Sequence, residues 1–228
     1  MKHTACLLGA AALLAAHCTH AATLPLLGVA GGSYTLKVTS LREARFKATV
    51  NQQYDFSCGS AALATLLTHQ YGYPVSEQEI FQEMYAAGDQ QKIRHAGFSL
   101  LDIKLYLEKR GFSADGFWLP LEKLEAAKLP AIVLINDKGY HHFVVIKGIR
   151  DNRILIGDSA TGVRAVERQQ FEAIWVNKML FVIHSHQNEA KFNLAADWNS
   201  VPRAPLASAV DRSGLDHVAL PKLGPGDF

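Results

Sequence analysis

A cysteine that precedes an apolar helical run is the first feature of this chain that suggests chemistry. Cys58 stands in "NQQYDFSCGSAALATLL" (51–67), and Gln52 lies six positions before it. At the start of a helix a cysteine can become a thiolate, because the helix dipole and the free N–H groups lower its pKa. The side-chain amide of Gln52 could then donate a hydrogen bond to an oxyanion, beside the backbone N–H of Cys58. This spacing predicts a nucleophile with an oxyanion donor upstream of it.

A thiol nucleophile also needs an imidazole partner that a third group orients. His142 begins the alternating stretch "HFVVIKGI", and Asp158 ends the next apolar stretch, "RILIGD". If both stretches are strands of one hairpin, the carboxylate of Asp158 comes to lie beside His142. Gln52, Cys58, His142 and Asp158 together predict a cysteine protease of the Cys-His-Asp type.

The elements that must position these residues follow from the apolar periodicity, which divides the chain into a helical half and a strand-rich half. Capping residues and glycine stops frame the helices, and turn sequences such as "NDKG" separate the strands. The fold class is therefore α+β, with an N-terminal helical half packed on a small antiparallel sheet. Helices are expected at 58–70, 76–88, 99–111 and 121–127, and strands at 131–135, 141–149, 153–158 and 178–183.

The first 21 residues have the pattern of a secretory signal peptide. Lys2 and His3 are followed by the apolar run 5–16, which is too short to span a bilayer, and small residues permit cleavage after Ala21. Cys18 does not follow a small residue, which favours cleavage over attachment of a lipid. No later segment is long and apolar enough to form a stable membrane span. We therefore expect an exported protein.

Each candidate residue also has an ordinary structural interpretation. Free cysteines are often buried as small hydrophobic side chains. A carboxylate that ends a strand is commonly a turn residue, and Gln52 can simply be a polar residue of a loop. The cysteine count favours chemistry for Cys58. Cys6 and Cys18 lie in the segment that is removed, so Cys58 remains as a single thiol in an oxidising compartment.

The composition is that of an ordinary globular chain. Of 228 residues, 49% are apolar and 19% are charged, and the net charge of +2 is too small to indicate a nucleic-acid partner. There is no glycine-rich phosphate loop, so no ATP site is expected. His141 and His142 are adjacent and face opposite sides of a strand, so they cannot chelate a metal together. We expect neither a metal nor another cofactor.

Residues 50 to 183 resemble the C39 peptidases, papain-like proteases known for removing double-glycine leaders from exported peptides. The resemblance is carried by "QQYDFSCGSAALATLL", "GFSLLDIKLYLEKRGF", "LPAIVLI", "HFVVIKGI", "ILIGDSATG" and "FEAIW". It implies a papain-like fold with Cys58 as nucleophile, His142 as general base, Asp158 as its orienting partner and Gln52 as oxyanion donor. The family's usual Asp-Pro is here Asp158-Ser159, which keeps the carboxylate.

The best-known C39 peptidases are fused to membrane spans and an ATPase, and this chain resembles neither part. It is more similar to the stand-alone periplasmic members found with bacterial functional-amyloid export systems. That resemblance implies a polypeptide substrate, either an exported amyloid subunit or a component of its secretion system. We expect a signal peptide at 1–21, an N-terminal extension at 22–49, a C39-like peptidase domain at 50–184 and a peripheral or disordered tail at 185–228.

Two other functions are compatible with the same residues. One is a C39-like module that binds or chaperones a secretion substrate without cutting it. The other is acyl transfer, or cleavage of a cell-wall amide, by the same triad, because the triad defines acyl chemistry and the pocket defines the substrate. A further question concerns Gly31-Gly32, which is either a flexible linker or a site at which the protein processes itself.

Overall fold

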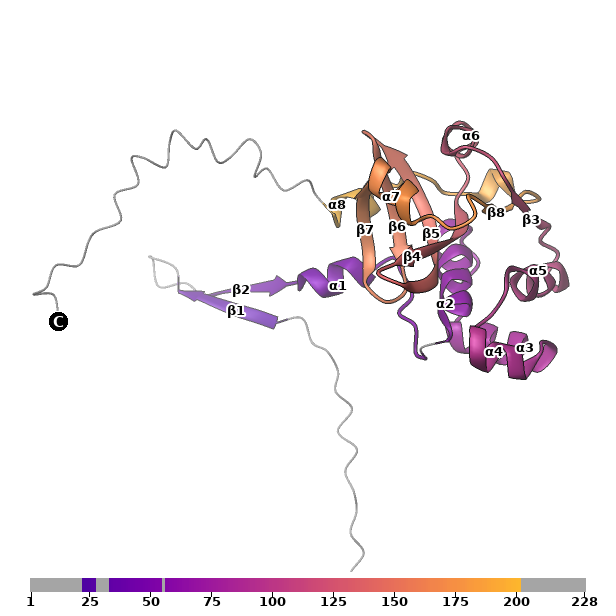
Figure 1. The fold of residues 1–228 in the computed structure, drawn as a ribbon. Coiled ribbons are helices and arrows are strands. Elements are labelled where there is room, and N and C mark those ends of the chain that lie inside the picture. Colours follow the sequence, from indigo (N-terminus) through magenta and orange to yellow (C-terminus); the bar gives the residue numbers. More distant parts are fainter. Residues whose placement is uncertain (1–21, 28–32, 55, 202–228) are drawn as a thin grey trace, which may run out of the picture. The chain divides into compact units, whose positions relative to one another are not determined.

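The structure, a computed structural model, describes residues 22–27, 33–54 and 56–201 (Figure 1). It divides into two compact units, one within residues 1–40 and one that begins at Leu41. The first unit holds a two-stranded antiparallel hairpin of β1 (Ala22–Leu27) and β2 (Ser33–Val38), whose register pairs Ala22 with Val38. All the predicted site residues belong to the second unit.

A six-stranded antiparallel sheet forms the centre of the second unit. Its spatial order is β3-β8-β4-β5-β6-β7, so the three consecutive strands β4, β5 and β6 are neighbours. The sheet consists of β3 (Ala114–Phe117), β4 (Ala131–Asp137), β5 (Tyr140–Arg150), β6 (Arg153–Asp158), β7 (Gly162–Glu167) and β8 (Leu180–Ile183).

Helices cover both faces of this sheet. The helix that begins at Cys58 lies against one face, with three further helices beyond it (Figure 1). The helices are α1 (Leu41–Phe46), α2 (Cys58–Thr65), α3 (Glu77–Ala87), α4 (Gln90–Ala96), α5 (Leu100–Lys109), α6 (Leu121–Ala127), α7 (Arg168–Ile174) and α8 (Ala195–Asn199), with a π-helical turn at Leu66–Gln70 and a 3-10 turn at Gln187–Glu189.

Helix α2 is buried along its whole length, as expected of a helix with apolar or small residues on every side. Its sequence, CGSAALAT, contains small side chains that allow its backbone to approach its neighbours closely. A Cβ atom at Gly59 would lie 2.9 Å from Cβ of Phe98, so only glycine fits there without a shift. The helix therefore holds Cys58 in a tightly packed position.

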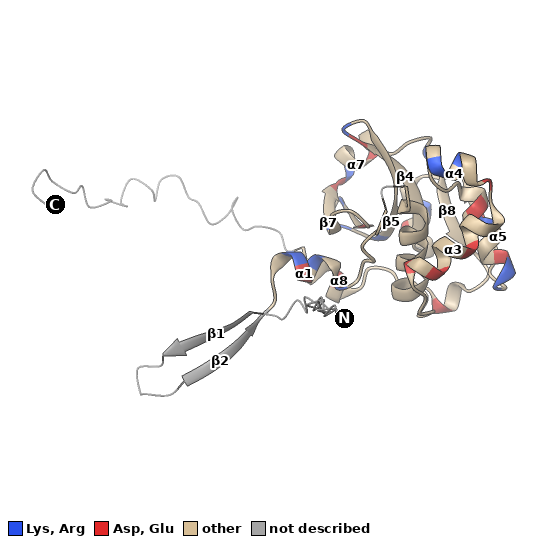
Figure 2. Cartoon of the chain, turned by 90° about the horizontal axis from the view of Figure 1, so that it is seen from below, with Lys and Arg blue, Asp and Glu red and all other residues tan. Residues whose placement is uncertain are grey.

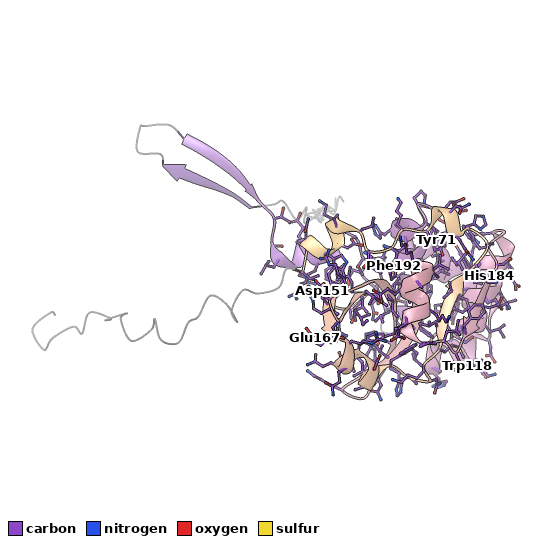
Figure 3. The ribbon with its side chains drawn as sticks, turned by 90° about the horizontal axis from the view of Figure 1, so that it is seen from above. Tyr71, Trp118, Asp151, Glu167, His184 and Phe192 are labelled. Carbon is purple, nitrogen blue, oxygen red and sulfur yellow. The ribbon has the colours of Figure 1, made fainter. Side chains whose placement is uncertain are left out.

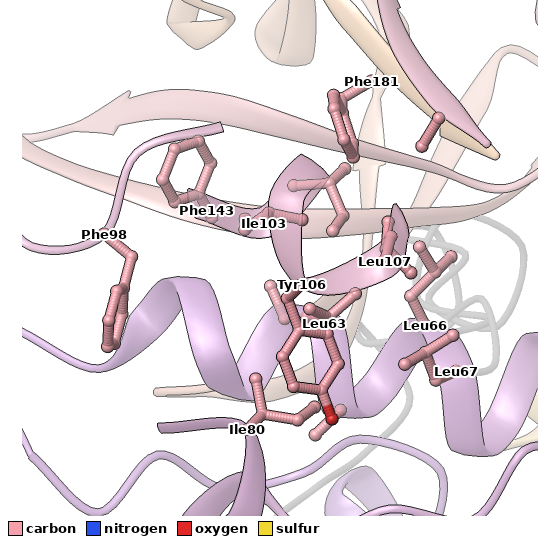
Figure 4. Packing of buried hydrophobic residues seen from close by; sticks show 14 of the residues in the cluster. Leu63, Leu66, Leu67, Ile80, Phe98, Ile103, Tyr106, Leu107, Phe143 and Phe181 are labelled. Carbon is pink, nitrogen blue, oxygen red and sulfur yellow. The ribbon is translucent and has the colours of Figure 1, made fainter. Parts of the chain in front are cut away.

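Two hydrophobic cores lie on the two faces of the sheet. On the first face, residues of α2, α3 and α5 pack against Phe143 and Phe181, with Leu63, Ile80 and Ile103 among them (Figure 4). On the second face, Leu121 of α6 and Phe171 of α7 pack with Val144 and Ile146. Successive residues of β5 alternate between the two cores, which confirms the period of two read from the sequence.

The α+β class and the antiparallel sheet are confirmed, and each of the predicted helices and strands is present within a few residues of its expected ends. Two predictions of local structure agree especially closely with the observed hydrogen bonds. Ser99 and Asp102 form a reciprocal capping box at the start of α5, and the turn at "NDKG" is closed by the N–H of Gly139, which donates to Oδ1 of Asn136 at 2.9 Å.

Helix α4, helix α7 and strands β3 and β7 were not predicted. Each is short, and α4 buries only Ile93 while α7 buries only Phe171, so neither helix shows a clear apolar period in the sequence. The cap of α4 is nevertheless regular, because the Asp89 carboxylate accepts hydrogen bonds from the N–H groups of Gln91 and Lys92.

The structure describes part of the segment 185–228, which the sequence analysis assigned to a peripheral or disordered tail. The later part of the segment packs against β5 and β6: Asn193 donates its N–H to the Lys147 carbonyl, and α8 buries Trp198, which packs with Leu155, to 2% exposure. The carboxylate of Asp197 lies 2.8 Å from Nζ of Lys147, which is itself fully buried. The proline content suggested a peripheral segment, but the single buried tryptophan and the ion pair hold it in place. The rest of the expected tail, 202–228, lies outside the described residues.

Charged side chains of both signs are mixed on the surface. In the view of Figure 2, acidic residues appear on α3, basic residues on the neighbouring α4 and both kinds on α5. A mixed surface of this kind gives no field of a single sign on this face of the protein. Within the described ranges, none of the helices combines the length and the apolar character needed to cross a membrane.

Candidate active site

Cys58 is the first residue of α2 and is 8% exposed. The turn before it is fixed by Ser57, whose hydroxyl donates to the carbonyl of Tyr54 at 2.9 Å and accepts from the N–H of the same residue at 3.2 Å. The backbone N–H groups of Phe143, Gly59 and Cys58 itself point toward the thiol. Strand β5 therefore meets the start of α2 at the sulfur atom.

The expectation of a lowered pKa for Cys58 does not match the structure. Burial raises the pKa of the thiol, and the N–H groups of Phe143, Gly59 and Cys58 lower it by a smaller amount, so the pKa is raised overall. The negative charge of Asp158 raises it further. The sequence indicates the helix start correctly but not the depth of burial, which disfavours the thiolate until a partner takes its proton.

His142 and Asp158 are in direct contact, as the hairpin prediction required. Nε2 of His142 lies 3.1 Å from Oδ2 of Asp158, and the two side chains are 5% and 1% exposed. The β5–β6 register pairs Val144 with Asp158, so the carboxylate reaches back along β5 toward the imidazole. The ring of Tyr140 stacks on that of His142, with 5.2 Å between centroids, and limits its rotation.

His142 directly precedes Phe143, whose N–H faces the thiol, so the two residues are neighbours in the part of β5 that meets the start of α2. With Nε2 engaged by Asp158, Nδ1 is the nitrogen left to accept a proton. Nδ1 is buried and has no hydrogen-bond partner among the described residues. Within the same residues, no hydrogen bond joins the ring of His142 to the Cys58 thiol.

His141 occupies a different position from its neighbour. Its side chain is exposed and lines the groove beside Cys58, on the face that Phe143 also occupies. Of the two adjacent histidines, only His142 is buried and paired with a carboxylate.

The carboxylate of Asp158 is enclosed by donors. Its Oδ1 accepts hydrogen bonds from the backbone N–H groups of Ala160 and Thr161, at 2.9 and 3.2 Å. Burial alone would raise the pKa of this carboxyl. The hydrogen bond and charge of His142, the N–H of Ala160 and the charge of Arg164 outweigh burial and hold the pKa at about 2. Asp158 is therefore an anion throughout the neutral range.

Arg164 is a functional neighbour that the sequence analysis missed. One of its terminal nitrogens lies 3.2 Å from Oδ2 of Asp158 and 3.1 Å from Oδ2 of Asp137. The signal that could have found it is the β6–β7 register, which pairs Asp158 with Gly162 and so brings Arg164, two positions further, to the same face. Arg164 and His142 therefore both contact Oδ2 of Asp158.

Gln52 is connected to the same site through Ser159. Its backbone N–H donates to the carbonyl of Ser159 at 3.1 Å, and its Oε1 accepts a hydrogen bond from the Ser159 hydroxyl at 2.8 Å. The pair lies next to Asp158, so the dipeptide Asp158-Ser159 touches both His142 and Gln52. The structure therefore connects Gln52, Asp158 and His142 through the dipeptide Asp158-Ser159, and Cys58 contacts the residue next to His142, Phe143.

A groove of about 670 Å³ opens beside the cysteine. Its floor and walls come mainly from α4, from the turn that joins α4 to α5, and from the sheet. It is lined by Cys58, Asp89, Lys92, Ile93, Ala96, Gly97, Phe98, Ser99, Leu101, Asp102, Leu134, His141 and Phe143. A groove of this size, mostly apolar with charged groups at its rim, is suited to an extended or helical polypeptide segment.

The chain was compared with known proteins. Residues 47–187 match the model of the Peptidase C39 family. Two proteins named "Probable functional amyloid protease FapD" are similar: that of Pseudomonas aeruginosa is 42% identical over 72% of this chain and 73% of its own length, and that of Pseudomonas fluorescens is 39% identical over 80% and 79%.

Among solved structures, the peptidase domain of Streptococcus ComA, a bi-functional ABC transporter, superposes with a TM-score of 0.50. It is 23% identical and covers 60% of this chain and 97% of its own. At that level of identity the match establishes only the fold, which is papain-like.

The fold and the family match define this protein as a cysteine peptidase. More specifically, the chain belongs to the Peptidase C39 family. Across the described part of the chain, no group of three or more His, Cys, Asp or Glu side chains is placed to hold a metal ion.

Proposed function

We propose that this peptidase cleaves an exported polypeptide in the periplasm, through an acyl-enzyme formed on Cys58. The observation that carries the proposal is the 3.1 Å contact between Nε2 of His142 and Asp158, which leaves Nδ1 of a buried imidazole as the available base. In acyl transfer, an imidazole that a carboxylate orients acts first as general base and then as general acid.

In the proposed reaction, Nδ1 of His142 takes the proton of the Cys58 thiol, and the sulfur attacks the carbonyl carbon of the scissile amide. The negative charge on the carbonyl oxygen is stabilised by the backbone N–H of Cys58, which has no acceptor within its own helix, and by Nε2 of Gln52. Collapse of this intermediate breaks the C–N bond, and His142 gives its proton to the leaving amine. Water, activated by the same imidazole, then hydrolyses the thioester.

Asp158 takes part without exchanging a proton. Its pKa of about 2 keeps it ionised, so it holds the Nε2–H of His142 and stabilises the imidazolium that forms when the thiol loses its proton. This stabilisation compensates for the raised pKa of Cys58, because the thiolate is formed together with a cation that Asp158 favours.

The names of the relatives support the choice of substrate. Two similar proteins, each matched over more than two thirds of its length, are described as functional amyloid proteases. We propose as substrate a polypeptide that is exported with such a system, either an amyloid subunit or a component of its secretion apparatus. Its segment next to the scissile bond would occupy the apolar groove beside Cys58.

The test is to express the chain and its Cys58→Ala variant together with candidate exported partners and to map the N-termini of those partners by mass spectrometry. The expected result is a new N-terminus in one partner that appears only with wild-type protein. A partner that co-purifies with both proteins and keeps its length would indicate a binding module instead. A partner that gains mass without a new terminus would indicate acyl transfer. Either of these two results contradicts the proposal.

A further inference from the structure

Ser159 lies directly after Asp158 and is 1% exposed. A buried hydroxyl needs a hydrogen-bond partner, and this one has a single defined acceptor, Oε1 of Gln52, at 2.8 Å. The backbone groups of the same two residues are also joined, by the Gln52 N–H and the Ser159 carbonyl at 3.1 Å. The two residues are therefore fixed at two points.

The direction of the side-chain bond matters for catalysis. A glutamine amide has an oxygen that accepts and a nitrogen that donates, and only the nitrogen can stabilise an oxyanion. The hydroxyl of Ser159 donates to Oε1, which assigns the oxygen to Ser159 and leaves Nε2 to face the reacting carbonyl. The opposite orientation would aim a partial negative charge at the oxyanion.

We propose that Ser159 is a positioning residue that fixes the orientation of the Gln52 amide and so completes the oxyanion site. The inference rests on the proposed role of Gln52 as oxyanion donor. It implies that a single turn, Asp158-Ser159, positions both halves of the machinery. The carboxylate of the first residue orients the base, and the hydroxyl of the second orients the oxyanion donor.

The experiment compares two reactions of the same thiol. Acylation of Cys58 by p-nitrophenyl acetate, followed as a burst of p-nitrophenolate, passes through an oxyanion. Alkylation by iodoacetamide forms no oxyanion and reports only on the access and ionisation of the thiol. The ratio of the two rates isolates the contribution of the oxyanion site.

Ser159→Ala should slow acylation by about fivefold to tenfold, the scale of one net hydrogen bond, and leave alkylation unchanged. Gln52→Ala should slow acylation by a larger factor. In the double variant, acylation should be no slower than in Gln52→Ala alone, because Ser159 acts only through that amide. Ser113→Ala is the control: it removes an exposed hydroxyl outside the site, and its acylation rate should equal that of wild type.

The outcomes separate the two claims. If Gln52→Ala slows acylation but Ser159→Ala does not, the inference is overturned while the role of Gln52 stands. If the losses in the double variant multiply, Ser159 acts elsewhere and the inference is also overturned. An unchanged rate in Gln52→Ala overturns both claims. If Ser159→Ala loses alkylation because it unfolds, Ser159→Thr, which keeps the hydroxyl, should acylate at the wild-type rate, and slow acylation with normal alkylation in that variant would contradict the proposal.

Discussion

At the scale of single residues, the reactivity of Cys58 depends on a balance between burial and hydrogen bonding. Burial raises the pKa of the thiol, and the surrounding N–H groups only partly offset that effect. An isolated thiol with this environment would be a weak nucleophile at neutral pH. The site therefore depends on His142 as the group that receives the proton.

The dependence on His142 can be measured by the pH profile of alkylation with iodoacetamide. In the wild-type protein the inflection of the rate should lie at a lower pH than in His142→Ala, because the wild-type thiolate forms as an ion pair with the imidazolium. In His142→Ala the inflection should move above about 8.5, since burial then acts unopposed by a cation.

His141→Ala is the matched control for that experiment, because it removes the neighbouring imidazole from the groove without touching Asp158. Its profile should follow that of wild type. An inflection that moves in His141→Ala and stays in His142→Ala would show that the wrong imidazole has been assigned as the base.

The depressed pKa of Asp158 makes a second prediction, which concerns stability in acid. The pKa of this carboxyl is about 2 in the folded protein, against about 3.9 in an unfolded chain. Because the unfolded chain binds the proton more readily, the stabilisation is fully present above about pH 4 and is lost as the pH falls to about 2. The stabilisation amounts to roughly 2.5 kcal/mol.

Asp158→Asn should therefore have a free energy of unfolding that depends less steeply on pH between about pH 4 and 2 than that of wild type. Urea unfolding at a series of pH values measures this difference. Glu125→Gln, which changes a carboxyl on the exposed surface, is the control and should retain the wild-type slope. Parallel slopes for wild type and Asp158→Asn would mean that the carboxyl is not held as an anion by the folded protein.

At the scale of secondary-structure elements, the sequence predicts the frame of the site well. The period of two along β5 distinguishes His142 from His141, and the glycine and asparagine turn residues locate the hairpins that bring Asp158 into place. Both signals are local, so a single sequence contains them.

The contributions of Arg164 and Ser159 could not be predicted in the same way. Arg164 reaches Asp158 only because β7 pairs with β6 in one particular register, and Ser159 reaches Gln52 across 107 positions of sequence. Such contacts depend on how distant segments pack. The depth of burial of Cys58, which reverses the expected direction of its pKa shift, depends on packing for the same reason.

Helix α8 is the element whose role differs most from the expectation. Its Trp198 is buried to 2% exposure, its indole N–H donates to Asn193, and the guanidinium of Arg150 lies 4.5 Å from the ring centroid. Asn193 in turn donates its backbone N–H to the carbonyl of Lys147. The segment is thus bound to β5, the strand that carries His142.

Trp198→Ala should lower the free energy of unfolding by about 3–5 kcal/mol, the usual cost of removing a buried aromatic side chain. Trp118→Ala is the matched control, because Trp118 is 69% exposed (Figure 3) and its removal should change stability by less than about 0.5 kcal/mol. Thermal melts of both variants decide the question. Similar melting temperatures for the two variants would indicate that residues 185–201 are peripheral and do not stabilise the fold.

At the scale of the whole molecule, the chain consists of two units that are described separately. The unit from Leu41 onward contains every residue of the proposed site. The unit within residues 1–40 contains the β1–β2 hairpin, which follows directly on the expected signal-peptide cut after Ala21. The connection between its strands, residues 28–32, holds the Gly31-Gly32 pair and lies outside the described residues.

The hairpin bears on the question of self-processing. Its register pairs Ala22 with Val38 and Leu27 with Ser33, so β1 is a strand only because β2 follows it in the same chain. Cleavage after Gly32 would detach β1, and a two-stranded hairpin cannot compensate for the entropy of holding a separate strand. We therefore expect the mature protein to begin near Ala22 in both wild type and Cys58→Ala when they are exported and purified. N-terminal sequencing and intact mass measure this directly. A start at Ser33 that requires Cys58 would instead establish self-processing and make residues 22–32 a leader that the enzyme removes from itself.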